Sequence, residues 1–462
     1  MIKQNRVLFI LVVYLLVFQQ IRAEETFAFR LYLKDKDHSA YSLEKPEEFL
    51  SEWTIQKREK NNIPIIKEDL PVSQNYLDQI ISLGLQPIVS SKWMNTVVVE
   101  SSDSMLIREI EKLDIIDSVK WVWRGSNLQL SNQNRRSDTA LVSSDIILNN
   151  YYGYAEKQTV LLQGEKLHEA GYKGEGMRIA MIDAGFQNVD RINAFDSLEL
   201  IGTENIVFPG ESVYLHDQHG TKVLSCIAAN IPGVMVGTAP KASYLLIKSE
   251  DGRTEYPIEE DYWVAAIEYA DSVGVDIISS SLGYYYYDAQ ELSYEQSQLD
   301  GQSVFISRAA GKVSKKGILL CSSAGNEGNG TWVNVTVPAD SRDMLTIGSI
   351  GADGKRSSFS SYGKTVDGRI KPDVVAIGGP AHLIDTDGQI TYGNGTSFAA
   401  PMVAGLAACL WQALPELSNM ELLELIRRSS DRYTNPDPEV GYGIPDMYKA
   451  YIEGQAYVKS KD

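Results

Sequence analysis

The chain of 462 residues carries a formal net charge of −18, and 44% of its residues are hydrophobic. This length allows two or three domains with a sizeable core. The acidic excess argues against nucleic acid or an anionic membrane as a partner.

Residues 1–23 have the pattern of a secretory signal peptide. Lys3 and Arg6 precede an apolar run at residues 7–18, and Ala23 supplies a small residue for cleavage. The run is short for a membrane span, which leaves a retained anchor as the less favoured alternative. We therefore expect an exported protein, extracellular or periplasmic.

Residues 24–124 are predicted to form a small unit of their own. A strand–helix–strand–helix–strand order is typical of a compact, ferredoxin-like α+β module. The second helix is expected to begin at Ser104 as its cap. The predicted strands are residues 27–33, 96–100 and 119–123, and the predicted helices are residues 74–83 and 104–113.

Residues 125–150 are rich in polar side chains and contain the dibasic pair Arg135-Arg136. Exposed segments of this kind are preferred sites of proteolytic cleavage. We predict a linker with a processing site, so that a mature chain would begin within it.

Residues 151–462 are predicted to form one α/β domain. Apolar strands that alternate with helices indicate a parallel sheet covered by helices on both faces. The strands are expected at residues 177–182, 244–247, 275–280, 318–322 and 344–350, and the helices at 221–229, 259–272, 304–315 and from Ser397 onward.

The three cysteines, Cys226, Cys321 and Cys409, lie in apolar runs and are too few for a disulfide framework. Buried free thiols are the favoured state. One disulfide with one free thiol is the alternative.

The small and apolar residues 393–411 predict a helix that is buried on all sides. Ser397 is expected at its N-terminus, and Pro401 in its first turn, where a missing N–H costs nothing. Serine is a common N-cap, so Ser397 could be only the helix cap. Its hydroxyl would also lie beside free backbone N–H groups.

Three further polar residues stand at the carboxyl ends of predicted strands or at a helix start, where functional groups of parallel sheets gather. Asp183 and Asn326 follow strands, and His219 opens a helix. Serine needs a base to become a nucleophile, and histidine needs a carboxylate to fix its tautomer. The order Asp183, His219, Ser397 is one of the known orders of a catalytic triad.

Four separated motifs resemble those of subtilisin-like serine peptidases. They are Ile182-Asp183-Ala184-Gly185, His219-Gly220-Thr221, Ser323-Ala324-Gly325-Asn326 and Gly395-Thr396-Ser397-Phe398-Ala399-Ala400-Pro401. The resemblance covers roughly residues 150–452, and the unit at residues 24–124 is similar in layout to the propeptide of this family, an intramolecular chaperone and inhibitor.

The resemblance implies a role for each matched residue. Asp183 would orient His219, the general base and acid, and Ser397 would be the nucleophile. Asn326 would donate its side-chain amide to the oxyanion. Ser281, Leu282 and Gly283 would form the edge that pairs with the substrate, and with Ser323, Ala324 and Gly325 would line the S1 pocket.

The loop from residue 186 to 214 follows no family pattern, so structural calcium is conceivable but has no assigned ligands. We expect no required cofactor and no metal site. His216, three residues before His219, is a weak candidate for a metal pair. The run of tyrosines at residues 284–287 favours an exposed loop, and the sharper alternative is that one ring shapes a substrate subsite.

The sequence therefore predicts an exported serine endopeptidase, expected to be a monomer, that acts on polypeptides and is held by its own propeptide. A non-catalytic peptide-binding protein on the same fold is the alternative. An esterase of the α/β-hydrolase type fails, because it needs a histidine after the serine, and the last histidine is His382.

Overall fold

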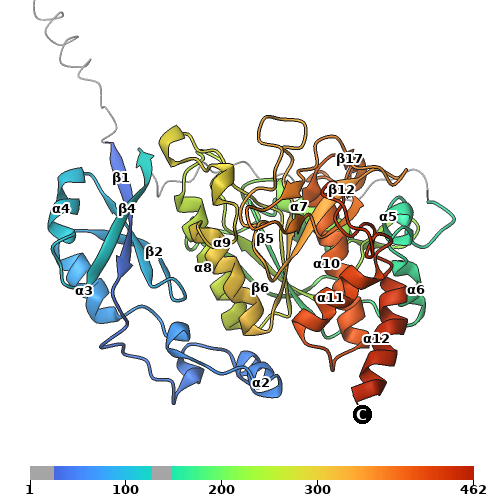
Figure 1. The fold of residues 1–462 in the computed structure, drawn as a ribbon, viewed down its shortest axis with the longest axis horizontal. Helices are drawn as coiled ribbons and strands as arrows, with labels where there is room; N and C mark the ends of the chain where they lie inside the picture. The colour runs from blue at the N-terminus through green and yellow to red at the C-terminus, as the bar shows by residue number, and fades with distance from the viewer. Residues whose placement is uncertain (1–24, 127–146, 462) are drawn as a thin grey trace, which may run out of the picture.

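The computed structural model describes residues 25–126 and 147–461. It contains a small N-terminal unit beside a larger α/β unit (Figure 1). The proposed signal peptide and the pair Arg135-Arg136 lie outside the described residues.

The N-terminal unit is an antiparallel four-stranded sheet with strand order β2-β3-β1-β4. Helices α3 and α4 pack on one face, where Tyr76, Ile80 and Ile110 join the apolar side chains of the sheet. The ferredoxin-like prediction is confirmed, although strand β2 and helix α2 were not predicted. The elements are β1 (Thr26–Leu33), α2 (Glu52–Lys60), α3 (Gln74–Ser82), β2 (Gln86–Ser91), β3 (Thr96–Ser101), α4 (Ile107–Ile110) and β4 (Ile116–Gly125).

The expected cap at Ser104 is wrong. The carboxylate of Asp103 accepts a hydrogen bond from the Met105 N–H at 2.8 Å, so Asp103 caps this segment. A single 3-10 turn, Ser104–Leu106, then precedes α4. A carboxylate is as good a cap as a hydroxyl, and the sequence places the two side by side.

The larger unit is built on seven parallel strands in the order β15-β12-β11-β10-β5-β9-β6. The predicted parallel sheet is confirmed. The two outermost strands were not predicted, because one is only four residues long and the other is partly exposed and lacks an apolar run. The strands are β5 (Arg178–Asp183), β6 (Glu199–Asn205), β9 (Ser243–Lys248), β10 (Ile277–Ser280), β11 (Leu319–Ser323), β12 (Leu345–Ile350) and β15 (Val374–Ile377).

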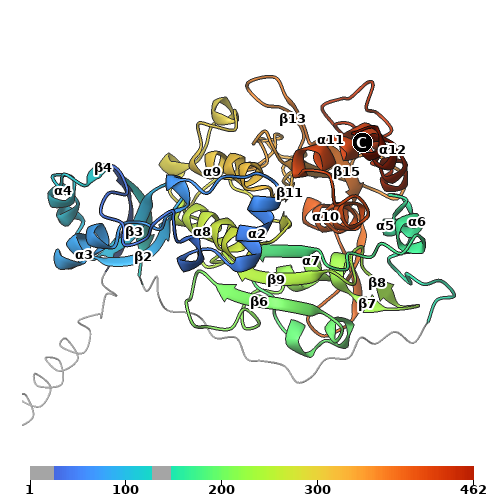
Figure 2. The same ribbon diagram turned by 90° about the horizontal axis from the view of Figure 1, so that it is seen from below.

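Helices cover both faces of this sheet (Figures 1 and 2). Neighbouring strand residues divide between two cores, so that Met181 packs with α7 and α10, and Ile182 packs with α8 and α9. The alternation explains why these strands are apolar throughout. The helices are α5 (Glu156–Val160), α6 (Gly164–Glu169), α7 (His219–Ala228), α8 (Ile258–Val273), α9 (Phe305–Val313), α10 (Thr396–Ala413), α11 (Asn419–Ser429) and α12 (Met447–Lys461), and the small strand pairs are β7 (Asn230–Ile231) with β8 (Met235–Val236), β13 (Gly363–Lys364) with β14 (Ile370–Lys371), and β16 (Ala381–Ile384) with β17 (Ile390–Gly393).

Helix α10 is the central helix of the larger unit. It is long and apolar enough to cross a membrane, but 89% of it is buried inside the protein. Gly395 is its N-cap, so the expected cap position of Ser397 is wrong, and Ser397 is the second residue of the helix. Pro401 lies inside the helix and not in its first turn, which has a consequence for the site described below.

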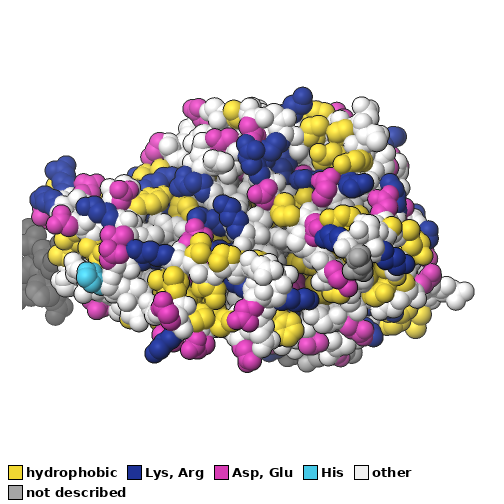
Figure 3. Space-filling model, turned by 60° about the horizontal axis from the view of Figure 1, so that its bottom comes forward, with side chains coloured by type: hydrophobic (Ala, Val, Ile, Leu, Met, Phe, Trp, Pro, Cys, Tyr) yellow, Lys and Arg dark blue, Asp and Glu magenta, His cyan; other side chains and the backbone are white. Residues whose placement is uncertain are grey.

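All three cysteines are buried and free, as favoured from the sequence. Their apolar surroundings raise the pKa of each thiol, which keeps them protonated and unreactive. The face shown in Figure 3 carries basic and acidic side chains interspersed, with apolar patches between them.

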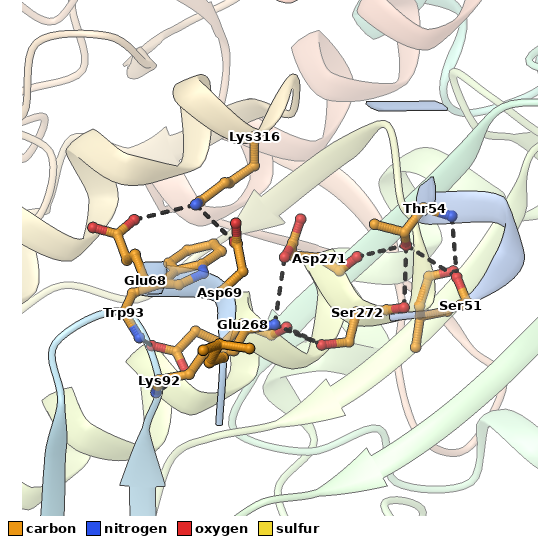
Figure 4. Close-up of polar contacts among 12 residues, drawn as sticks. Ser51, Thr54, Glu68, Asp69, Lys92, Trp93, Glu268, Asp271, Ser272 and Lys316 are labelled. Carbon is orange, nitrogen blue, oxygen red and sulfur yellow. Dashed lines mark hydrogen bonds and ion pairs between the residues drawn. The ribbon is translucent and has the colours of Figure 1, made fainter. Parts of the chain in front are cut away.

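The N-terminal unit docks on α8 and α9 through buried charged groups (Figure 4). Asp271 accepts two hydrogen bonds from Arg58 at 2.8 and 2.9 Å. Glu268 accepts from the backbone N–H groups of Lys92 and Trp93 at 2.7 and 3.0 Å. In the opposite direction, Lys316 of the larger unit donates to Asp69 at 2.8 Å.

Candidate active site

The carboxyl ends of β5, β10 and β11 meet the N-termini of α7 and α10 at one edge of the sheet. A cleft of about 370 Å³ opens there. Its lining includes His219, Ser397 and Asn326 together. The four residues singled out from the sequence are thus gathered at one place, because Asp183 lies directly behind His219.

Asp183 and His219 form a close pair. Asp183 is the last residue of β5 and is 1% exposed. Its Oδ1 atom lies 2.7 Å from His219 Nδ1 and also accepts the N–H of Ala184 at 2.8 Å. A carboxylate on Nδ1 fixes the proton there and leaves Nε2 as the basic atom.

The start of α7 is held tightly against the end of β5. A Cβ atom on Gly220 would lie 2.4 Å from the carbonyl oxygen of Gly185 and 3.0 Å from Cβ of Asp183. Only glycine allows this approach, which brings His219 within reach of Asp183. The side chain of Asp217 caps the turn by accepting the His219 N–H at 2.7 Å.

The net effect of its surroundings raises the pKa of His219 above its ordinary value of 6.5. Burial lowers it, but the charge of Asp183 and the hydrogen bond from Nδ1 raise it by more. Asp217 and Glu250 add to the increase. The imidazolium form is therefore stabilised, as a proton-accepting histidine requires.

Ser397 and Ser281 form two hydrogen bonds, because each donates its hydroxyl group to the backbone carbonyl of the other. Ser281 Oγ donates to the backbone carbonyl of Ser397 at 2.9 Å, and Ser397 Oγ donates to the carbonyl of Ser281 at 3.3 Å. In a regular helix the carbonyl of Ser397 would accept the N–H four residues later, but that residue is Pro401, which has none. Ser281 supplies the missing donor.

The side-chain amide of Asn326 is held in one orientation by hydrogen bonds to Thr396. Its Oδ1 atom accepts from the backbone N–H of Thr396 at 2.9 Å and from Thr396 Oγ1 at 3.1 Å. Because donors occupy the oxygen, the amide nitrogen is the end left for another acceptor. Asn326 and the N-terminus of α10 can therefore both donate into the cleft.

The predicted substrate-binding residues divide into two groups. Ser281, Leu282 and Gly283 line the cleft, and within the described residues the backbone groups of Leu282 and Gly283 have no hydrogen-bond partner. Ser323 and Gly325 also line it. Ala324 does not, because it is fully buried among Val335 and Ala339.

The tyrosine run does not form the exposed loop that the sequence favoured. Tyr284 and Tyr287 are buried, and their hydroxyl groups donate to Glu250 at 2.8 Å and to Glu260 at 2.7 Å. Tyr286 is exposed. Tyr285 is the ring of this run that lines the cleft.

Sequence reasoning missed the acidic lining of the cleft. Asp217, Glu250, Glu255 and Glu327 all contribute to it. Glu250 and Glu255 follow β9, so the rule that functional groups gather after parallel strands could have found them.

His216, the weak candidate for a metal pair, does not line the cleft. Its Nε2 lies 2.9 Å from Glu211, and its ring packs against Phe208.

Two family models match the chain. The subtilase family, Peptidase S8, matches residues 174–443, and the Peptidase S8 propeptide domain of Bacteroidota matches residues 28–139. A propeptide domain is therefore present.

Two curated relatives are also similar to this chain, each with 30% sequence identity. Serine protease AprX of Bacillus subtilis (strain 168) is 30% identical over 303 residues, which are 58% of this chain and 64% of AprX. Thus the chain spans slightly less than two thirds of that relative. Subtilisin NAT of Bacillus subtilis subsp. natto is 30% identical over 320 residues, covering 67% of this chain and 75% of the relative.

A solved structure supports the fold. The crystal structure of MycP1 with the N-terminal propeptide removed has a TM-score of 0.51 and 22% identity, covering 64% of this chain and 96% of that one. Because the subtilase model matches more than half of the 462 residues, the chain belongs to the subtilase family of serine peptidases, Peptidase S8.

Proposed function

We propose that this protein is an exported serine endopeptidase that cleaves polypeptides through an acyl-enzyme intermediate. The observation that supports it most strongly is the 2.7 Å contact between buried Asp183 and His219, in a cleft that also holds Ser397. A peptide-binding protein without activity would have no need for this pair.

In the proposed mechanism, Nε2 of His219 accepts the proton of Ser397 Oγ as that oxygen attacks the peptide carbonyl. Asp183 holds the imidazole and stabilises its charged form. Ser397 Oγ at present donates to Ser281 O, so it must turn toward His219 when substrate binds. Such hydrogen bonds often tighten only in the complex with substrate.

The oxyanion of the tetrahedral intermediate would accept hydrogen bonds from Asn326 Nδ2 and from the N–H of Ser397. His219 then protonates the leaving amine, and water hydrolyses the acyl-enzyme by the reverse use of the same groups. The protein supplies every group in these steps, so the proposal requires no cofactor.

The proposed processing follows from the two-unit organisation. Residues 1–23 would be removed on export, residues 24–124 would act as propeptide, and the linker at 125–150 would be cut to free a monomeric peptidase of residues 151–462. N-terminal sequencing of the secreted protein tests this, since a mature start at residue 24 would contradict it.

The nucleophile is tested with Ser397→Ala in the full chain. We expect complete loss of labelling by a fluorophosphonate and of casein hydrolysis, because Ser397 is the nucleophile in the proposed mechanism. Labelling that persists in the variant would place the nucleophile elsewhere. A wild-type chain that is cut in the linker, stays unlabelled and hydrolyses nothing would favour the peptide-binding alternative.

A further inference from the structure

Three carboxyl groups lie together beside the proposed catalytic residues. Glu250 and Glu255, in the loop after β9, line the same cleft as His219 and Ser397. Glu259 lies behind them in the first turn of α8. One oxygen of each glutamate lies within 4.8 Å of the others. We call Glu250, Glu255 and Glu259 the acidic cluster.

Among the described residues, no member of the acidic cluster forms a salt bridge. The positive charge closest in effect is Lys248, which lowers the pKa of Glu250 without contacting its carboxylate. Lys248, the last residue of β9, is buried, and its Nζ donates to the backbone carbonyls of Ala184 and Glu250. Arg253 holds the carboxylate of Asp251, with Nε at 2.8 Å from Oδ1.

Glu259 is tied to the rest of the chain by one hydrogen bond from outside the acidic cluster among the described residues. Glu259 is 1% exposed, and its Oε1 accepts the N–H of Asp251 at 3.1 Å. Its Oε2 is buried, and no nitrogen or hydroxyl donor in the described part of the chain reaches it. Burial and the charges of Glu250 and Glu255 raise the pKa of Glu259 well above its usual range, so a protonated Glu259 donates to the carboxyl of Glu250. The cluster thus holds a shared proton where a cation could stand.

The energetics favour a cation. Burial raises the pKa of Glu250 to about 7. Burial, together with the charges of Glu250 and Asp288, raises the pKa of Glu255 to about 8. A positive group placed among these carboxyls would relieve their repulsion and restore their charged forms.

The order of the strands indicates which part of a substrate meets the cluster. An extended peptide paired with Leu282 and Gly283 would direct successive side chains to opposite sides. The end of β11 lies on one side of this edge, and the ends of β5 and β9 lie on the other. With the P1 side chain beside Ser323 and Gly325, the P2 side chain faces His219 and the cluster.

We propose that the acidic cluster is the subsite for a basic side chain, arginine or lysine, at position P2 of the substrate. The inference deepens the proposed function and rests on it. The protein's own linker has such a sequence, since Arg135 and Arg136 are the only basic residues between 125 and 150. Cleavage after Arg136 would place Arg135 at P2.

The docked N-terminal unit ends close to this subsite. Trp123, near the end of β4, donates from Nε1 to Thr254 Oγ1 at 3.3 Å, and Thr254 is the residue before Glu255. The chain thus leaves the module next to the loop that carries the cluster. This makes the linker sequence a suitable probe.

The test compares two quenched-fluorescent peptides, one with the sequence of residues 133–138 and one with the Arg135→Gln change. The wild-type chain, Glu250→Gln/Glu255→Gln and the matched control Glu327→Gln are assayed in parallel. Glu327 lines the same cleft outside the cluster. Because both peptides use the same catalytic groups, the ratio of their kcat/KM values measures only the preference for the P2 side chain.

We expect the wild-type protein to prefer the arginine peptide about 10- to 100-fold, as close charge pairs across an interface do. The double variant should bring the ratio near one while it still cleaves the glutamine peptide, and Glu327→Gln should keep the preference.

A wild-type ratio near one, or an undiminished preference in the double variant, would overturn the inference. A preference that appears only with added Ca²⁺ would assign the cluster to a metal ion and would overturn it also. Fluorophosphonate labelling separates the two proposals, since an unlabelled wild-type protein fails the proposed function itself.

Discussion

In the proposed mechanism, His219 accepts the proton of Ser397 only while its imidazole is neutral. The net effect of Asp183 and burial raises the pKa of His219 above 6.5, so the ring stays charged to a higher pH than a free histidine. We predict that kcat/KM for a neutral peptide falls with decreasing pH below a midpoint above 6.5. A pH profile of kcat/KM reports this value for the free enzyme.

Asp183→Asn is the control for this prediction. It removes the negative charge that raises the pKa of His219, and burial, which lowers the pKa, then dominates. The midpoint should move to lower pH, and kcat should drop by about 10⁴ because the tautomer is no longer fixed. An unchanged midpoint would mean that another group controls the profile.

At the scale of residues, the sequence predicts well which polar side chains gather at the cleft, because each stands at a strand end or helix start that can be recognised locally. Asp183, His219 and Asn326 are of this kind. The hydrogen bond from Ser281 Oγ to the carbonyl of Ser397 could not be predicted, since it depends on where that carbonyl lies in space. The acidic lining was missed because Glu250 belongs to no motif, and only its place after β9 could have indicated it.

Helix α10 depends on a donor from another element. Pro401 removes the N–H that the carbonyl of Ser397 would accept, and Ser281, just after β10, replaces it at 2.9 Å. Because Ser397 is 6% exposed, loss of this donor leaves a buried carbonyl unpaired. We predict that Ser281→Ala lowers the free energy of unfolding by about 1–3 kcal/mol.

A double-mutant cycle tests the assignment. Pro401→Ala restores the N–H four residues after Ser397, so Ser281→Ala should cost much less in that background. Denaturant unfolding would be followed in a Ser397→Ala background, which prevents autolysis and keeps the carbonyl. Equal costs of Ser281→Ala with and without Pro401 would show that the hydroxyl does not serve this carbonyl.

At the scale of elements, the five inner strands of the large sheet could be predicted because their apolar residues are consecutive, whereas the four-residue outer strand β15 could not, although it is buried. The strand β6 and the helix α2 could not. The edge strand β6 is partly exposed and mixes polar with apolar residues, and α2 is polar apart from Trp53 and Ile55. Its place is set by contacts with α8, more than two hundred residues away in the chain.

At the scale of the whole molecule, the two units are joined by the docking of the N-terminal unit on α8 and α9. At its centre, Asp271 is 2% exposed and receives both bonds from Arg58, which also lies 2.9 Å from Asp69. Asp271→Asn would leave the buried guanidinium with one carboxylate in place of two. Removing one partner of a buried charge pair costs about 2–5 kcal/mol in binding.

We therefore predict that, once the linker is cut, the Asp271→Asn protein loses its N-terminal unit on dilution at a concentration about 30-fold higher or more than the wild type. Recovery of activity toward a neutral peptide after dilution measures this release. Lys67→Ala is the control, because the Lys67–Asp37 pair is exposed and lies within the N-terminal unit, so its loss should leave release unchanged. Equal release from all three proteins would mean that the buried pairs orient the propeptide without holding it, and that apolar contacts such as those of Trp123 with Tyr256 provide the affinity.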